Sequence, residues 1–134
     1  MSAFHVHVFF MTAGLLAMTA GVSVARFLRR KLWWLKIHRT AGITGAVCLS
    51  IGFAAAVVMV SQSGDGQFRV PHAWLGLATI LCAVAAPTLG HLQFKIRSRI
   101  QQLRLWHRRT GYVALILTLL SALSGLVVAG IILP

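Results

Sequence analysis

The sequence predicts an all-α fold, a bundle of four helices that span a membrane. Four stretches of 25 residues contain no Asp, Glu, Lys or Arg: 1–25, 40–64, 70–94 and 110–134. A helix of ~20 apolar residues, rising ~1.5 Å per residue, crosses a hydrocarbon core of ~30 Å. A soluble helix would carry charges on its outer face, which these stretches lack. We expect one transmembrane domain, 1–134, with helices over about 4–26, 39–61, 71–94 and 107–132.

The distribution of charge predicts the orientation of the bundle. The chain has 13 basic residues and one acidic residue, a net charge of +12. Six basic residues lie in each of two connectors: Arg26, Arg29, Arg30, Lys31, Lys36 and Arg39, then Lys95, Arg97, Arg99, Arg104, Arg108 and Arg109. The positive-inside rule places these connectors in the cytoplasm and both termini on the non-cytoplasmic side. Because the charges flank apolar runs, we expect contact with anionic lipid and not with nucleic acid.

The first stretch and the two cysteines have simple interpretations. The basic charges come after the apolar run 1–25, whereas in a signal peptide they come before it. We therefore expect a retained span. Cys48 and Cys82 fall inside apolar runs, where we expect small buried side chains. Pro71 suits the first turn of the third helix, since its missing amide hydrogen has no partner there.

A histidine lies near the start of each apolar run: His7, His38, His72 and His107. His38-Arg39-Thr40-Ala41-Gly42 is echoed by His107-Arg108-Arg109-Thr110-Gly111, which indicates a duplication. Because helices alternate in direction, His38 and His107 share the cytoplasmic depth, and His7 and His72 share the other. The spacing therefore predicts two pairs of imidazoles, each pair joining alternate helices.

Paired imidazoles at one depth are typical of haem ligation. A haem iron with two axial histidines takes one donor from each of two facing helices, whereas zinc or copper would need three or four clustered ligands. A flat macrocycle also needs small residues on the helix faces that carry the histidines. The residues on these faces are Met11, Gly14, Met18 and Gly21 after His7, Gly42 and Gly45 after His38, Gly76, Thr79, Ala83 and Gly90 after His72, and Gly111 and Ala114 after His107. The alternatives are structural or proton-handling histidines, and glycines that merely allow close helix packing.

These residues resemble the cytochrome b561 superfamily of transmembrane dihaem cytochromes. Residues 71–79 look like its His-Ser-Trp-Leu-Gly segment. His7 with Met11 and Gly14 resembles the first core helix of the family. Residues 35–38 resemble its second core helix, and Trp106-His107 with Gly111 resembles its fourth. The resemblance covers essentially the whole chain and implies two haem b groups, one held by His7 and His72 and the other by His38 and His107. Only the four core helices are present, so we expect a minimal, bacterial-type version in the inner membrane.

Several assignments stay open at this point. His5 is the alternative to His7 as a ligand, although the spacing to Met11 and Gly14 favours His7. His91 is too far from His72 to share its iron, and either contacts a propionate or quinone or caps its helix. Basic residues beside the ligands are candidate partners of haem propionates: Arg39, Arg108 and Arg69, with Lys36 and Arg109.

The resulting functional hypothesis is transmembrane electron transfer between a donor at one face and an acceptor at the other. The donor or acceptor would be a quinol, an ascorbate-like reductant or a protein, and the direction of transfer is open. One alternative is a haem-bearing, quinone-reactive anchor within a larger respiratory complex, with redox partner subunits. Another is a haem-free transporter or structural bundle. Whether the chain is itself an oxidoreductase or the electron-transfer subunit of one is left open.

Overall fold

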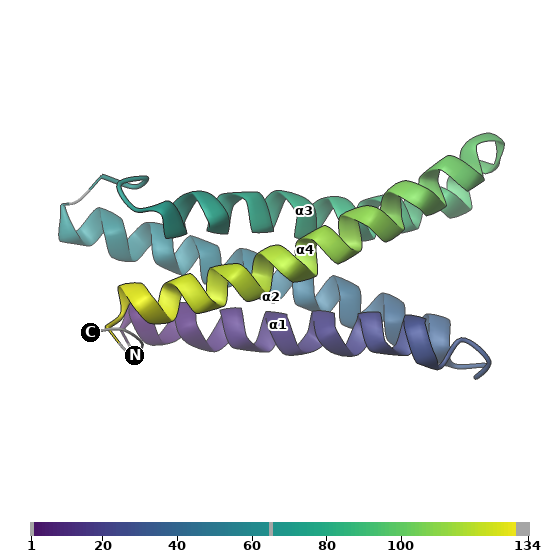
Figure 1. The fold of residues 1–134 in the computed structure, drawn as a ribbon, viewed down its shortest axis with the longest axis horizontal. Helices are drawn as coiled ribbons and strands as arrows, with labels where there is room; N and C mark the ends of the chain where they lie inside the picture. Colours follow the sequence, from purple (N-terminus) through teal and green to yellow (C-terminus); the bar gives the residue numbers. More distant parts are fainter. Residues whose placement is uncertain (1, 65, 131–134) are drawn as a thin grey trace.

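The computed structural model describes residues 2–64 and 66–130, and within them it contains helices and no strand. The four long helices are α1 (Ala3–Phe27), α2 (Trp34–Ser63), α3 (Pro71–Lys95) and α4 (Ile100–Val128), with a short 3-10 helix, η1 (Arg97–Arg99), before α4. Figure 1 shows them running roughly alongside one another in an elongated bundle. The predicted all-α, four-helix fold is therefore confirmed.

The bundle consists of two antiparallel hairpins, α1 with α2 and α3 with α4. Most contacts between helices lie within a hairpin, and far fewer join one hairpin to the other. The beginning of α1, the end of α4 and the α2–α3 connector lie at one end of the bundle, which we call the terminal end (Figure 1). The two basic connectors lie at the opposite end, which we call the basic end. Each hairpin therefore presents one histidine near each end.

Two helices begin earlier than the sequence indicates. α2 begins at Trp34 instead of residue 39, and α4 begins at Ile100 instead of residue 107. The predicted starts were placed where charge disappears, which marks the edge of the apolar layer. A helix continues through basic residues into the headgroup region, so the charge boundary is not a helix boundary. The predicted residues 131–132 of α4 lie outside the described residues.

Glycine and proline set the two ends of the connector between the hairpins. Gly64 ends α2 with φ 76°, a left-handed conformation that glycine adopts at little cost. Val70 is extended and Pro71 occupies the first turn of α3, as expected. Asp65, the only acidic residue of the chain, lies outside the described residues.

The centre of the bundle is small and mostly apolar, although Thr79, Thr118 and Ser121 are also buried there, and its outer surface is largely apolar as well. Met18, Leu49, Ala83 and Ala114, one from each helix, form the buried cluster. Many large apolar side chains are exposed along all four helices, and all four helices are long and apolar enough to cross a membrane. The chain is thus an integral, multi-pass membrane protein, and its orientation stays a prediction.

Glycines bring α1 and α2 close together. A Cβ built on Gly14 would lie 2.7 Å from Leu49 Cγ, and one built on Gly45 would lie 2.7 Å from Met18 Cγ. The expectation that these two glycines leave room for a macrocycle is wrong. They instead allow close approach of two membrane helices, the role of small residues in many membrane proteins.

Candidate functional site

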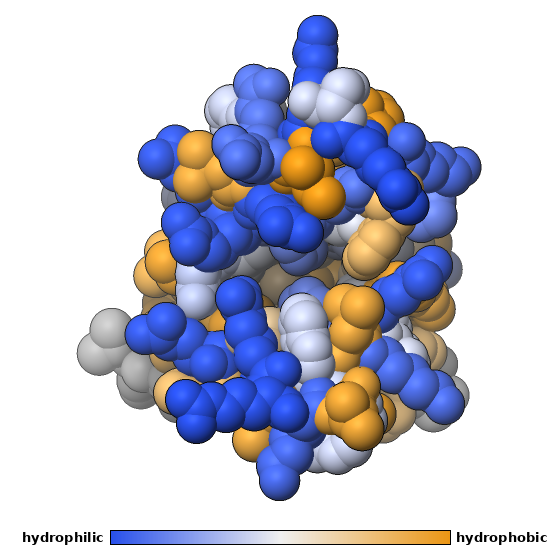
Figure 2. Space-filling view, turned by 90° about the vertical axis from the view of Figure 1, so that its right-hand side faces the viewer, coloured by the Kyte–Doolittle hydropathy of each residue, from blue (hydrophilic) through white to orange (hydrophobic). Residues whose placement is uncertain are grey.

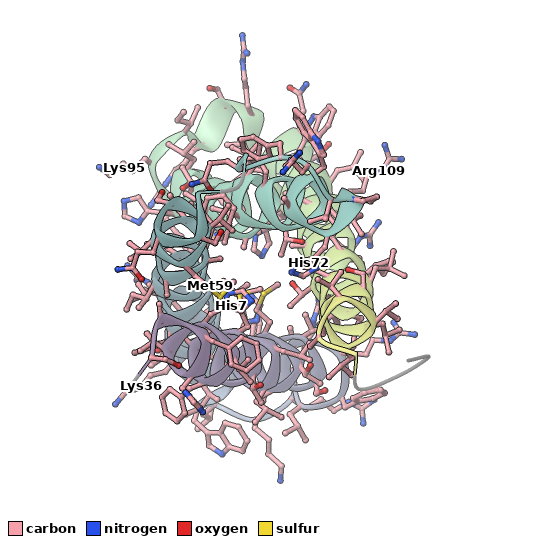
Figure 3. The ribbon with its side chains drawn as sticks, turned by 90° about the vertical axis from the view of Figure 1, so that its left-hand side faces the viewer. His7, Lys36, Met59, His72, Lys95 and Arg109 are labelled. Atoms are coloured by element: carbon pink, nitrogen blue, oxygen red, sulfur yellow. The ribbon has the colours of Figure 1, made fainter. Side chains whose placement is uncertain are left out.

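The structure brings the four predicted histidines together in two pairs. The ring centroids of His7 on α1 and His72 on α3 are 6.3 Å apart, with ring planes at 89°. Those of His38 on α2 and His107 on α4 are 5.8 Å apart, with planes at 77°. Each pair joins one hairpin to the other. Figure 3, which looks onto the terminal end, shows His7 and His72 pointing toward each other across the space between the hairpins.

The Nδ1 atoms of three histidines donate hydrogen bonds to backbone carbonyls of the partner helix in the same hairpin. His7 Nδ1 lies 2.8 Å from the carbonyl oxygen of Gly52, and His38 Nδ1 lies 2.9 Å from that of Gly21. His107 Nδ1 lies 2.7 Å from the carbonyl oxygen of Ala86. A carbonyl only accepts, so Nδ1 carries the proton and the lone pair of each neutral ring is on Nε2.

His72 makes the equivalent contact through a serine. Its Nδ1 lies 2.9 Å from the Oγ of Ser124, and that hydroxyl donates to the carbonyl oxygen of Ser121 at 3.0 Å. Because the hydroxyl hydrogen is used in this second bond, Ser124 Oγ accepts from His72 Nδ1. All four histidines therefore present the lone pair of Nε2 to a metal, and the bond at Nδ1 fixes the orientation of each ring.

A regular spacing underlies these bonds. On each helix the position 14 residues after the histidine is small: Gly21, Gly52, Ala86 and Ser121. In an antiparallel hairpin this position of one helix lies level with the histidine of the other, so the two helices exchange hydrogen bonds at both ends. Fourteen residues of helix span about 21 Å. The two histidine levels are separated by this distance, with the Met18–Leu49–Ala83–Ala114 cluster between them.

Glycines next to the histidines do two different things. A Cβ on Gly90 would lie 3.1 Å from His107 Cε1, and one on Gly125 would lie 3.1 Å from His72 Cε1, so these two glycines make room for the rings. Gly42 and Gly111 each stand one turn after a histidine and on the same face. A Cβ on either would meet nothing within 4 Å, although both residues are half-buried.

The geometry of the pairs fits a metal held between two opposed imidazoles. A metal–imidazole bond is about 2 Å long and the ring centre lies about 1 Å further back, so two opposed ring centres are roughly 6 Å apart. The observed separations of 6.3 and 5.8 Å agree with this value. Crossed ring planes are allowed because a ring turns about its metal–nitrogen bond without breaking it. The open faces of Gly42 and Gly111 are where a flat ligand would pass.

The other two histidines lie elsewhere. His5 is exposed, lies 2.6 Å from Ser2 Oγ through its Nδ1 and packs edge-on against Phe4. His91 is exposed on α3, one residue beyond the glycine that contacts His107. In the described residues, no three side chains of His, Cys, Asp or Glu gather into a cluster. The imidazoles thus occur in twos, and His7, not His5, faces His72.

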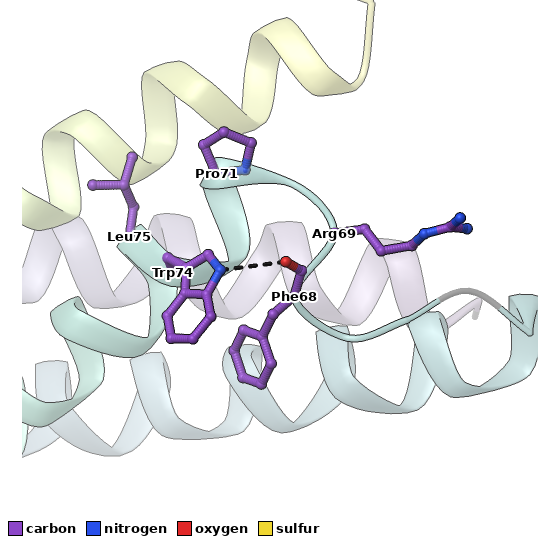
Figure 4. Close-up of a pocket in the computed structure, with 5 residues that line it drawn as sticks. All are labelled: Phe68, Arg69, Pro71, Trp74 and Leu75. Carbon is purple, nitrogen blue, oxygen red and sulfur yellow. Dashed lines mark hydrogen bonds between the residues drawn. The ribbon is translucent and has the colours of Figure 1, made fainter.

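The candidate arginines lie at the two ends of the bundle. Arg39 and Arg108 directly follow His38 and His107 and are exposed at the basic end. At the terminal end Arg69 lines a shallow recess with Phe68, Pro71, Trp74 and Leu75 (Figure 4). There the indole Nε1 of Trp74 donates to the carbonyl oxygen of Phe68 at 3.3 Å. All three arginines are close in sequence to a histidine of the pair at the same end.

Sequence reasoning missed the partners that orient the histidines. Gly52, Ala86, Ser124 and Gly125 were not singled out, since a backbone carbonyl leaves no mark in a sequence. Gly21 and Gly90 were assigned to the faces of His7 and His72, yet they contact the histidine of the opposite helix, His38 or His107. The recurrence of a small residue 14 positions after every histidine is the signal that would have identified the carbonyl acceptors of His7, His38 and His107. Ser124, the acceptor of His72, lies 17 positions after His107 and does not follow this spacing.

Comparison with known proteins identifies the family of the chain. The chain matches no curated protein and no solved structure. The family model described as eukaryotic cytochrome b561 matches residues 4–132, which is nearly the whole chain and includes all four paired histidines. The chain therefore belongs to the cytochrome b561 family, whose members bind haem b in a membrane and transfer electrons across it.

Proposed function

We propose that the chain binds two haem b groups, one between His7 and His72 near the terminal end and one between His38 and His107 near the basic end. Electrons would pass between a donor at one membrane face and an acceptor at the other. The observation that carries this proposal is the presence of two imidazole pairs, each drawn from both hairpins and each with Nδ1 already bonded.

The residues of the chain have distinct roles in this proposal. A bound haem supplies an iron that accepts and releases one electron. The imidazoles would hold it through Nε2, while the carbonyls of Gly52, Gly21 and Ala86 keep three of the rings in position and would strengthen them as ligands. The apolar cluster between the two levels excludes water. Arg39 and Arg108 at one end, and Arg69 at the other, are the proposed partners of the propionates.

The redox partners belong to the two faces of the membrane. A quinol, an ascorbate-like reductant or a redox protein is the proposed donor or acceptor, and a partner subunit is a further possibility for the same contact. The positive-inside rule supports a cytoplasmic location for the basic end. A bacterial inner membrane is the proposed membrane. Under this orientation His38 and His107 would hold the haem that lies nearer the cytoplasm.

The experiment that tests the proposal is a haem count on the purified full chain. After expression with ample haem, a pyridine haemochrome assay should give two haem b groups per chain, and the oxidised and dithionite-reduced spectra should show low-spin iron with two axial histidines. A colourless protein, or one haem per chain, would overturn it. Turnover of the isolated chain with quinol or ascorbate then tells an independent oxidoreductase from a subunit that needs its complex.

A further inference from the structure

Pro87 is, within the described residues, the only proline in the interior of a helix, since Pro71 stands in the first turn of α3. A proline lacks the N–H that would bond the carbonyl four residues earlier, and its ring presses on that carbonyl. At Pro87 this carbonyl belongs to Ala83, which is buried. Water cannot replace a lost backbone bond in the membrane interior. Pro87 therefore weakens α3 at the level of the His38–His107 pair.

The carbonyl that holds His107 belongs to the peptide bond between Ala86 and Pro87. His107 Nδ1 lies 2.7 Å from the oxygen of Ala86. An ordinary peptide inside a helix is held on both sides, through its C=O and through its N–H. The Ala86–Pro87 peptide has no N–H, so no hydrogen bond ties it to Ala83, and the proline ring pushes it away from that residue. Its oxygen is therefore freer to tilt from the axis of α3 toward the imidazole on α4.

The α3–α4 hairpin has a different feature beside each of its two histidines. The residue 17 positions after the histidine is Ser124 on α4 and Leu89 on α3. Ser124 supplies a hydroxyl that lies 2.9 Å from His72 Nδ1, whereas leucine has no polar group. The residue 15 positions after the histidine is Ala122 on α4 and Pro87 on α3. The helix that lacks the serine is thus the one that carries the proline.

The α1–α2 hairpin has neither feature. The residues 15 and 17 positions after its histidines are Val22 and Val24 on α1, and Phe53 and Ala55 on α2. Its two helices pack more closely than α3 and α4 do. Its histidines therefore reach carbonyls of ordinary peptides on the partner helix, at 2.8 and 2.9 Å. A proline or a serine beside the acceptor occurs only in the more loosely packed hairpin.

We propose that Pro87 is a positioning residue, which turns the Ala86 carbonyl toward His107 and thereby sets the strength of this imidazole as an iron ligand. The inference rests on the proposed haem between His38 and His107. A hydrogen bond from Nδ1 to a carbonyl makes Nε2 more basic and lowers the reduction potential of a bound haem. Figure 2, which faces the basic end, shows hydrophilic side chains gathered over both connectors, α3–α4 above and α1–α2 below. Replacing Pro87 alters none of these charges, so its effect on the potential reports the hydrogen bond.

The test is Pro87→Ala in the full, haem-loaded chain. Alanine restores the bond to the Ala83 carbonyl and favours the helix, so the variant should fold. In the dithionite-reduced, diamagnetic protein, the NMR signal of the His107 Nδ1 proton should move upfield as its hydrogen bond weakens. The midpoint potential of the haem near the basic end should rise, with two haems still bound and the other potential unchanged. Pro71→Ala is the matched control, because a proline in the first turn removes no bond within the helix.

A serine placed as on α4 separates an effect on the hydrogen bond from an effect on the shape of α3. In Pro87→Ala with Leu89→Ser, the new hydroxyl has the position of Ser124 and can accept from His107 Nδ1, so the potential should fall back toward the wild-type value. Pro87→Ala with Leu81→Ser, at an exposed position of α3, should not recover.

Three results would overturn the proposal: unchanged Nδ1 signal and potentials in Pro87→Ala, an equal shift of both haems, or no recovery with Leu89→Ser. The last result would mean that Pro87 acts only on the shape of the helix. A haem count below two in the wild type would instead refute the proposed function, so the two failures are distinguishable.

Discussion

In both hairpins the residues 14 and 18 positions after each histidine are small, but glycine occupies a different one of these two positions in each hairpin. In the α1–α2 hairpin the residue 14 positions after each histidine is glycine and the residue 18 positions after it is alanine: Gly21 and Ala25, then Gly52 and Ala56. In the α3–α4 hairpin the order is reversed, with Ala86 and Gly90, then Ser121 and Gly125. Both hairpins hold their histidines through Nδ1 all the same.

The difference shows what each glycine permits. In the first hairpin, a Cβ on Gly52 would lie 3.2 Å from the backbone nitrogen of Met11, so glycine lets the helices approach. In the second hairpin, the rings of His107 and His72 themselves lie against Gly90 and Gly125. Contacts between α1 and α2 are accordingly more extensive than those between α3 and α4. The first hairpin is the more tightly packed one, and the second accommodates imidazoles between its helices.

The largest expected effect comes from removing a ligand, and it should be the same in either hairpin. His107→Ala should reduce the haem count from two to one and leave the His7–His72 haem bound, because each pair is independent of the other. His7→Ala should do the converse. The pyridine haemochrome assay measures the count, and His5→Ala and His91→Ala serve as controls that keep both groups. Loss of neither haem, or of both, in His107→Ala would contradict the pairing.

Gly111→Leu should strongly weaken binding of the haem near the basic end while leaving the bundle folded. A Cβ at this glycine would meet no protein atom within 4 Å, so the new side chain enters open space on the helix face of His107, where the proposed ligand would lie. Binding of that haem should weaken at least about tenfold, equivalent to roughly 1.4 kcal/mol. Gly42→Leu should have the same effect from the other hairpin. Val113→Leu, at an exposed position of α4, is the control. Unchanged haem binding would show that these glycines do not face the macrocycle.

An alanine at Gly90 should have a smaller effect confined to the α3–α4 hairpin. The added Cβ would lie 3.1 Å from His107 Cε1, so the ring must shift by a few tenths of an ångström. We expect a cost of about 1 kcal/mol in overpacking. The spectrum of the haem near the basic end should change, with the other haem unaffected, as read by low-temperature absorption. Ala25→Gly, at the corresponding place on α1, should change neither spectrum. If both substitutions behave alike, the two hairpins do not differ as described.

An effect of similar size, read in the midpoint potential, is expected for Ser124→Ala. This change removes the hydroxyl that accepts from His72 Nδ1, a neutral hydrogen bond worth about 1 kcal/mol. A weaker acceptor makes the imidazole a weaker donor to iron, so the midpoint potential of the haem near the terminal end should rise. Redox titration of both haems measures it. Ser50→Ala, whose hydroxyl bonds only the Ala46 carbonyl of its own helix, is the matched control. A shift of the other haem instead would refute the assignment of Ser124.

The sequence predicted the fold and the pairing for clear physical reasons. Freedom from charge over 25 residues is a direct consequence of the bilayer, and alternating helix direction turns sequence position into depth. The starts of α2 and α4 were wrong because charge reports where the apolar layer ends and not where hydrogen bonding in the helix ends. The membrane orientation and the haem count stay predictions.

The inner arrangement of the site was less accessible from the sequence. Glycine serves three uses in this chain: helix approach at Gly14, ring accommodation at Gly90, and an open face at Gly111. The sequence alone does not distinguish these three roles of glycine, because each role depends on which atoms of the neighbouring helix lie next to it. The carbonyl acceptors were equally hidden, although the spacing of small residues after each histidine would have revealed their positions.

The sparse contact between the hairpins has a consequence for the life of the protein in a cell. Each imidazole pair bridges the two hairpins, so a cofactor bound by each pair would also hold the two hairpins together. A newly made chain short of haem would then consist of two loosely associated pieces, accessible to the quality-control proteases of the membrane. Iron and porphyrin supply would thus set the abundance of the protein as well as its redox capacity.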